Sequence, residues 1–97
     1  MKKRDPSRIR NLLAGNLREL RLRQSWSQYD LADEARLRQA LISALELATA
    51  NPTLESLDRI AFALGVEVAD LLLPDANATV QANKRKRLAK RRPVKRF

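Results

Sequence analysis

An all-α fold is the fold class that this sequence predicts, and three observations support it. Alanine and leucine are abundant, glycine occurs only twice in 97 residues, and aromatic residues make up 4%, a composition that favours helix. Apolar residues recur at the three- and four-residue spacing of amphipathic helices. No segment shows the alternating pattern of a half-buried strand. We therefore expect five helices in one small domain, followed by a tail.

The first helix is expected to begin near Pro6 and to end near Gln24. Asp5 or Ser7 can cap its N-terminus, and proline is favoured at the first helical position. Its inward stripe is predicted to be Ile9, Leu13, Leu17 and Leu20.

Two short helices joined by a tight turn are expected within residues 27–47. Ser27 and Asp30 are three residues apart, which approximates a capping box at the start of the first. A break follows at residues 36–37, and the next helix is expected at about residues 38–47. The pair is predicted to turn inward Leu31, Ala35, Ile42 and Leu45.

Two further helices complete the predicted domain. After the stop at residues 51–52, Thr53 is expected to cap the fourth helix. Gly65 is expected to end it, because glycine takes a positive φ without strain. A short fifth helix is expected at about residues 68–72. The fourth helix is predicted to turn inward Leu54, Leu57, Ile60, Ala61 and Leu64.

Charge separates the tail from the rest of the chain. Residues 1–83 contain 11 Lys/Arg and 11 Asp/Glu, so the net charge of +9 comes entirely from the last 14 residues. We therefore predict a compact domain at residues 1–74 and a basic C-terminal tail at residues 75–97. The tail is expected to form either an extra helix at about residues 76–90 or a disordered arm.

Composition excludes several kinds of site and location. Neither cysteine nor histidine is present, which excludes a disulfide framework, a zinc site and a histidine-based acid/base pair. No apolar stretch approaches the ~20 residues of a membrane span, and no apolar segment follows the basic start as in a signal peptide. The expectation is a cytoplasmic protein that is not an enzyme and needs no metal, cofactor or membrane.

The helix expected at residues 38–47 carries outward side chains suited to a DNA major groove, which admits one α-helix. The residues predicted to contact bases are Arg38, Gln39, Ala40, Ser43 and Ala44. Gln39 donates and accepts at once, as adenine requires, while the alanines offer methyl contacts to thymine. A site rich in A·T pairs is therefore expected. The alternative is that Gln39, Arg38 and Ser43 are merely solvated surface residues.

From Leu17 to Leu72 the chain resembles the Xre/Cro–CI family of helix-turn-helix regulators. The shared residues include the block SQxxLA at residues 27–32 and the run NPTLESLDRIAxALGV at residues 51–66. These segments combine a helical core pattern with polar residues that the core does not require. The resemblance implies a five-helix, lambda-repressor-like DNA-binding domain, with its helix-turn-helix at about residues 27–47.

The resemblance also implies roles for single residues. It assigns Gln39 to reading the groove, and Gln28 to a backbone phosphate and to bracing Gln39. Glu46 is expected to pair with Arg18 or Arg21 of the first helix. The other residues predicted to contact phosphates are Tyr29, Arg36, Thr49 and Asn51.

The chain departs from the family pattern at two turn positions. Arg36 stands where glycine is usual, and a left-handed backbone there costs an arginine about 1 kcal/mol. A phosphate contact by Arg36 is one hypothesis for how this strain is offset. Ala48 replaces the usual glycine after the third helix, which predicts that this helix continues further.

A homodimer on palindromic double-stranded DNA is expected, because one half-site of about 4–5 base pairs is too short to be unique in a genome. The predicted dimer interface is Val66, Val68, Leu71, Leu72 and Leu73. The alternative is that these residues cover the core of the monomer. The expected function is sequence-specific transcriptional regulation, as a repressor or autoregulator associated with the nucleoid.

Three other functions stay open on the sequence. Family members of this size include controller proteins of restriction–modification systems, and antitoxins that have a toxin partner. The basic tail instead suggests a non-specific nucleic-acid-binding protein. The cations predicted to bind DNA non-specifically are Lys84, Arg85, Lys86, Arg87, Lys90, Arg91 and Arg92. A solvated tail without a function, and a tail that binds RNA or an acidic protein, are the alternatives.

Overall fold

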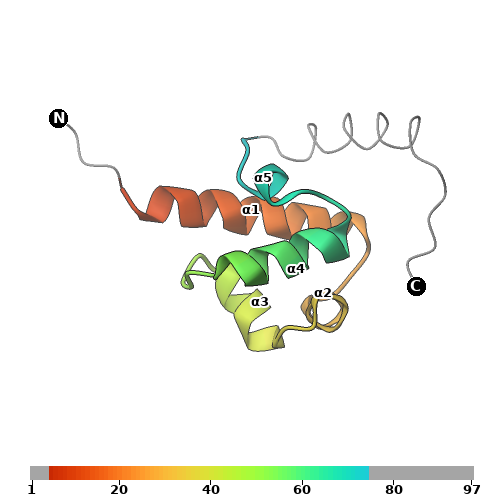
Figure 1. Ribbon diagram of the computed structural model, residues 1–97. Coiled ribbons are helices and arrows are strands. Elements are labelled where there is room, and N and C mark those ends of the chain that lie inside the picture. Colours follow the sequence, from red (N-terminus) through yellow and green to blue (C-terminus); the bar gives the residue numbers. More distant parts are fainter. Residues whose placement is uncertain (1–4, 75–97) are drawn as a thin grey trace, which may run out of the picture.

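The computed structural model describes residues 5–74, which form five helices and no strand (Figure 1). The helices are α1 (Ser7–Arg23), α2 (Gln28–Ala35), α3 (Gln39–Glu46), α4 (Leu54–Leu64) and α5 (Val68–Leu71). α3 packs against α1 and α2, α4 against α2 and α5, and α5 against α1. The all-α prediction is confirmed for this part of the chain. The expectations for the tail, including its cations, lie outside the described residues.

Asp5, the residue before the N-cap Pro6, forms hydrogen bonds to the first residue of α1. Its Oδ1 accepts hydrogen bonds from the Ser7 backbone N (2.9 Å) and from Ser7 Oγ (2.8 Å). The backbone hydrogen bond is the main reason that the pKa of the Asp5 carboxyl lies below its usual value. Because the pKa is lowered in the folded state, this contact stabilises the fold above the ordinary carboxyl pKa, and the stabilisation disappears as the pH falls.

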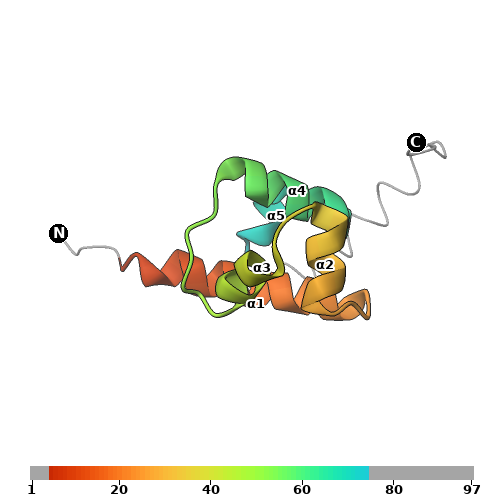
Figure 2. The same cartoon turned by 90° about the horizontal axis from the view of Figure 1, so that it is seen from below.

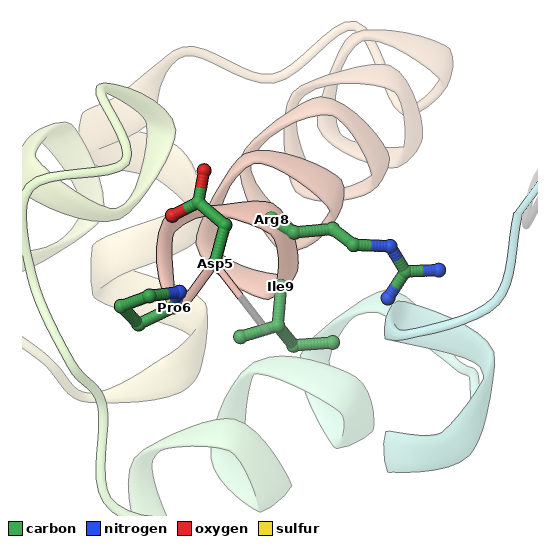
Figure 3. Close-up of a pocket in the computed structure, with 4 residues that line it drawn as sticks. All are labelled: Asp5, Pro6, Arg8 and Ile9. Carbon is green, nitrogen blue, oxygen red and sulfur yellow. The ribbon is translucent and has the colours of Figure 1, made fainter. Parts of the chain in front are cut away.

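The apolar stripe of α1 is buried except at its first turn. Leu13, Leu17 and Leu20 lie in the core, whereas Ile9 is 44% exposed, so its predicted inward position is wrong. Figure 1 shows the N-terminal end of α1 reaching past the neighbouring helices. Ile9 there lines a surface hollow together with Asp5, Pro6 and Arg8 (Figure 3).

Side-chain caps fix the starts of α2 and α4 as predicted. Ser27 Oγ accepts from the Asp30 backbone N at 3.0 Å, and Asp30 Oδ2 accepts from the Ser27 backbone N at 2.8 Å. This reciprocal pair is the predicted capping box. Thr53 Oγ1 accepts from the Ser56 backbone N at 3.0 Å at the start of α4.

One apolar core holds the helices together, and its fully buried side chains are Leu17, Leu31, Ile42, Leu45, Ile60 and Leu71. Leu54 is an exception to the predicted core face, since it is 80% exposed. It is the first residue of α4, where the helix has only just left the loop, and the core face of α4 begins one turn later at Leu57.

Each of the four longer helices is followed by a residue with a left-handed backbone. Their φ values are 61° at Ser25, 57° at Arg36, 61° at Ala48 and 73° at Gly65. After each of them, the next backbone N–H bonds to the carbonyl five positions earlier, as Leu37 N does to Ala32 O at 2.9 Å. This is the Schellman arrangement, which satisfies carbonyls at the end of a helix.

Two of these turns contain Arg36 and Ala48, the residues that replace the usual glycines of the family pattern. Ala48 is left-handed and ends α3, so the prediction that this helix continues further is wrong. Arg36 does adopt the strained conformation, and its carbonyl accepts a hydrogen bond from Arg59 Nη1 of α4 at 3.3 Å. The turn between α2 and α3 is therefore attached to α4.

α5 is attached to α1 by one amide group. Asn16 Nδ2 donates to the carbonyls of Leu71 and Leu73, both at 2.8 Å. Leu71 is fully buried and Val66 is nearly so, and these two members of the predicted dimer interface therefore belong to the monomer core. Among the helices of residues 5–74, none is long and apolar enough to cross a membrane.

Candidate nucleic-acid interface

α2 and α3 form the helix-turn-helix that the sequence predicted. The two helices are joined by a turn at residues 36–38 and pack through Leu31, Ala35, Ile42 and Leu45, all of them buried. Figure 2 shows α3 seen from below with α2 beside it. The remaining side of α3 faces away from the other helices of the described domain.

The residues predicted to contact bases lie on this outer side of α3 or at its start. Arg38 precedes the helix with an extended backbone, and both Arg38 and Ala40 are exposed. Gln39, Ser43 and Ala44 are half-buried. Leu47, which follows the helix, is 69% exposed and extends the apolar part of the surface. We call this set of six residues the reading face.

The residues predicted to contact phosphates come from segments that flank α3. Gln28 and Tyr29 start α2, Arg36 lies in the turn before α3, and Asn51 lies in the loop after it. Gln28 is half-buried and the other three are exposed. The helix start, the turn and the loop thus present polar groups next to the reading face.

Thr49 is a weaker candidate for a phosphate contact than the sequence suggested. Its backbone N donates to Ala44 O at 2.9 Å, and its Oγ1 donates to the same oxygen at 3.1 Å. Phosphate oxygens only accept hydrogen bonds, so Thr49 has to break a bond to α3 before it can donate to one.

A chain of hydrogen bonds connects the reading face to α1. Gln39 Nε2 donates to Gln28 Oε1 at 2.8 Å, and Gln28 Nε2 donates to Glu46 Oε1 at 3.2 Å. Arg21 then donates to both carboxylate oxygens of Glu46, from Nε at 2.6 Å and from Nη2 at 2.9 Å. We call the four residues Arg21, Glu46, Gln28 and Gln39 the polar relay.

The base of the polar relay is a buried ion pair. The side chains of Arg21 and Glu46 are 10% and 5% exposed, and Arg21 Nη1 also donates to the carbonyl of Trp26 at 2.6 Å. Hydrogen bonding to Glu46 raises the pKa of the Arg21 guanidinium further above its already high value. The cation is therefore permanent, and it offsets the unfavourable position of a carboxylate at the C-terminus of α3.

Sequence reasoning found part of this network. The brace between Gln28 and Gln39 was expected from the family resemblance, and Arg21 is the one of the two suggested arginines that pairs with Glu46. The bond from Gln28 to Glu46 and the bond from Arg21 to the Trp26 carbonyl were missed. Arg18 and Arg21 each lie four residues after a buried residue, Ala14 and Leu17, so helical spacing does not distinguish them and the packing of α1 against α3 selects Arg21.

The charge of the described domain is close to balanced. Residues 5–74 contain eight Lys/Arg and ten Asp/Glu. A general attraction to phosphates is therefore not what residues 5–74 supply.

The comparison with known families decides the identity of this arrangement. The helix-turn-helix family model HTH_3 matches residues 17–71, which run from α1 to the end of α5. The chain belongs to the helix-turn-helix family of Xre/Cro–CI type. Its members are DNA-binding transcription regulators and not enzymes.

Two relatives support the same assignment. A hypothetical transcription factor of Neisseria meningitidis serogroup B is 39% identical over 70 residues, which are 72% of this chain and 66% of that protein, just under two thirds of its length. The control protein C.BamHI of Bacillus amyloliquefaciens is 42% identical over 65 residues, which are 66% of this chain and 80% of that protein.

Two solved structures resemble this helix-turn-helix protein in three dimensions. The crystal structure of the hypothetical transcription factor NHTF from Neisseria superimposes with a TM-score of 0.69 and 32% identity, covering 84% of this chain and 94% of the other. The clp gene regulator ClgR from Corynebacterium glutamicum gives a TM-score of 0.64 and 28% identity, with 84% and 87% covered. Both are regulators by name, as the family predicts.

Proposed function

We propose that this transcription regulator binds a palindromic operator as a homodimer and represses transcription, including that of its own gene. The observation that carries the proposal is the position of Gln39, at the start of α3, half-exposed and held by the polar relay. A groove-reading helix reaches deepest with its N-terminal residues. A preorganised amide at that position is what recognition of a base edge requires, and binding there places the protein at the nucleoid.

In this proposal, one set of residues contacts the bases and another contacts the phosphate backbone. Gln39 reads an adenine, Ser43 and Arg38 bond neighbouring base edges, and the methyl groups of Ala40 and Ala44 contact thymine. Gln28, Tyr29, Arg36 and Asn51 hold the phosphate backbone and so fix the register of α3 in the groove. Repression follows when the bound dimer covers a promoter.

Selection of bound DNA from a random library at roughly 150 mM salt tests the proposal, because affinities depend strongly on salt. We expect a two-fold symmetric motif, preferred over random DNA by at least ~10³. A library without an enriched motif contradicts sequence-specific binding, and an enriched motif without symmetry contradicts the palindrome.

Replacing Gln39 by alanine is expected to remove the preference at one position in each half-site. The loss of one bidentate hydrogen-bond pair costs about 1–3 kcal/mol for the preferred base. The measurement is a repeat of the selection with Gln39→Ala. Gln24→Ala is the matched control, since Gln24 is exposed just after the end of α1, and it should leave the motif unchanged. An unaltered motif in Gln39→Ala argues against the reading role.

The homodimer is proposed to form around α5. With Val66 and Leu71 in the core, the accessible apolar residues of the predicted interface are Val68, Leu72 and Leu73. Leu72 and Leu73 continue the chain directly after α5, where Asn16 holds the backbone carbonyls of residues 71 and 73. A small domain gains stability by covering such side chains with a second copy.

Sedimentation at micromolar concentration is expected to show a species of twice the 11.1 kDa chain mass. Leu73→Lys should shift the equilibrium towards the monomer, because a charge is costly to bury in an apolar interface. Leu22→Lys serves as the control, since Leu22 is exposed on α1. A single species with the mass of one chain, for the unmodified protein, rules out the dimer at that concentration.

A second function, non-specific nucleic-acid binding through the tail, is favoured by the distribution of charge. The described domain carries a small excess of acidic residues, whereas residues 84–97 carry nine cations and no anion. We propose that residues 1–74 supply specificity and that residues 75–97 add affinity for any sequence, since each neutralised phosphate releases a counterion.

Deletion of residues 84–97 is expected to weaken binding to operator and to random DNA by the same factor. The dependence of affinity on salt should also become shallower, by about 0.9 in slope for each phosphate that the tail no longer neutralises. The measurement is a salt titration of the dissociation constant on both DNAs. If the deletion weakens binding to the operator alone, the tail has a sequence-specific role instead.

The similarity to the control protein C.BamHI favours a controller role over an antitoxin role among the alternatives. The antitoxin alternative, with its toxin partner, gains no comparable support.

A further inference from the structure

We propose that Glu46 determines which base Gln39 prefers, because it fixes the orientation of two side-chain amides. This inference rests on the proposed role of Gln39 as a base reader. Gln28 lies between the carboxylate of Glu46 and the amide of Gln39, so its orientation decides which end of Gln39 faces the DNA. Glu46 itself is a buried positioning residue that cannot touch a base.

The orientation of Gln28 follows from the chemistry of its neighbour. A carboxylate oxygen that pairs with an arginine accepts hydrogen bonds, and both oxygens of Glu46 accept from Arg21. The atom of Gln28 that lies 3.2 Å from Glu46 Oε1 must therefore be the donor Nε2. The oxygen of Gln28 is then directed towards Gln39.

The orientation of Gln39 follows in turn. Because Gln28 presents its Oε1, Gln39 must turn its Nε2 inward, where it donates at 2.8 Å. The outward end of Gln39 then offers Oε1 as an acceptor and the second N–H as a donor. Adenine presents one donor, N6, and one acceptor, N7, in the major groove. The two patterns are complementary, and all the hydrogen-bonding groups of Gln39 find partners.

The reversed orientation favours a different base. If Gln39 turned its oxygen inward, its outward end would offer two N–H donors. Guanine presents two acceptors in the major groove, N7 and O6. The acceptor-only carboxylate of Glu46 thus discriminates between adenine and guanine, although its side chain is only 5% exposed.

Glu46→Gln is the direct test, since an amide can present either a donor or an acceptor to Gln28. The dissociation constants are measured for two operators, which carry adenine or guanine at the position that depends on Gln39. Their ratio is taken on one protein preparation, so that the folded fraction cancels. We expect roughly a 10-fold or larger preference for adenine in the unmodified protein, and a ratio close to one in Glu46→Gln.

Glu55→Gln is the matched control. Glu55 is also a carboxylate paired with an arginine, Arg59 at 2.9 Å, but it is 75% exposed on α4 and lies outside the polar relay. The same chemical change there should leave the ratio intact. If Glu46→Gln weakens binding to both operators and keeps the ratio, Glu46 has only a structural role and the proposal is overturned.

Gln28→Met gives a second test that keeps both residues of the buried ion pair. It keeps a similar side-chain volume and removes both the donor and the acceptor that orient Gln39. The ratio is expected to fall several-fold, because Gln39 can then adopt either orientation, and a retained ratio also overturns the proposal. If Gln39→Ala changes no position of the selected motif, the base-reading function fails first, and this inference fails with it.

Discussion

Replacing Glu46 by alanine is expected to lower the free energy of unfolding by about 3–5 kcal/mol, the usual cost of removing one partner of a buried ion pair. Arg21 would be left as a buried cation without its carboxylate, since its other bond goes to the neutral carbonyl of Trp26. Small domains are stabilised by only ~5–15 kcal/mol. Urea unfolding followed by the fluorescence of Trp26, the single tryptophan, measures the change.

Two further variants test whether the loss of stability in Glu46→Ala comes from the burial of the ion pair or from the loss of any paired carboxylate. Glu55→Ala removes an exposed ion pair on α4 and should cost no more than about 1 kcal/mol. The double variant Arg21→Met with Glu46→Leu should recover most of the lost stability, because apolar residues of similar volume often replace a buried pair without loss. A Glu46→Ala protein as stable as the parent contradicts the buried-pair interpretation.

Introducing glycine at Ser25, Arg36 and Ala48 together is expected to raise the free energy of unfolding by about 2 kcal/mol. A left-handed backbone costs a non-glycine residue about 1–2 kcal/mol. Glycine removes this cost, but its greater conformational freedom in the unfolded chain offsets part of the gain in stability. All three positions have φ near 60°. In a domain of this size the midpoint of thermal unfolding should rise by roughly 10 °C.

The two natural glycines provide the reciprocal controls. Gly65 is left-handed with φ 73°, so Gly65→Ala should destabilise the fold by about 1 kcal/mol through backbone strain alone, since an added Cβ has no neighbour within 4 Å. Gly15 lies inside α1 with equally open surroundings, and Gly15→Ala should stabilise it by a similar amount. A triple-glycine variant that melts at the parent temperature refutes the strain argument.

The helix starts could be predicted from the sequence because capping is a local interaction. Ser27 and Thr53 bond to the backbone three residues later, and those partners are close in the chain. Ile9 and Leu54 were misplaced because both belong to a first helical turn, where helical spacing continues but the core does not. Periodicity identifies the side of a helix and not how far the core extends along it.

The end of α3 shows a second limit. Ala48 has no intrinsic preference for a left-handed backbone, and the sequence therefore favoured a longer helix. In the structure the turn is fixed by hydrogen bonds from the backbone N and the hydroxyl of Thr49 to Ala44 O. The core contacts of Leu45 hold the preceding helix in place. Tertiary packing overrides local propensity at this position.

The reading face could be predicted because outward residues of one helix follow from its buried ones. Only part of the polar relay could be predicted, since it joins residues 21, 28, 39 and 46 from three helices. The family pattern offered two arginines for Glu46, and only the packing of α1 against α3 selects Arg21. Contacts of this kind depend on how the helices are oriented, which one sequence does not encode locally.

The attachment of α5 has a consequence for how two copies associate. A helix of four residues is far too short to persist by itself, so its order depends on Leu71 in the core and on the amide of Asn16. In the proposed dimer, a partner seated on Leu72 and Leu73 would also restrict the local opening of this segment. Association and the ordering of residues 68–73 are then thermodynamically coupled, and hydrogen exchange in these residues would slow as the protein concentration rises.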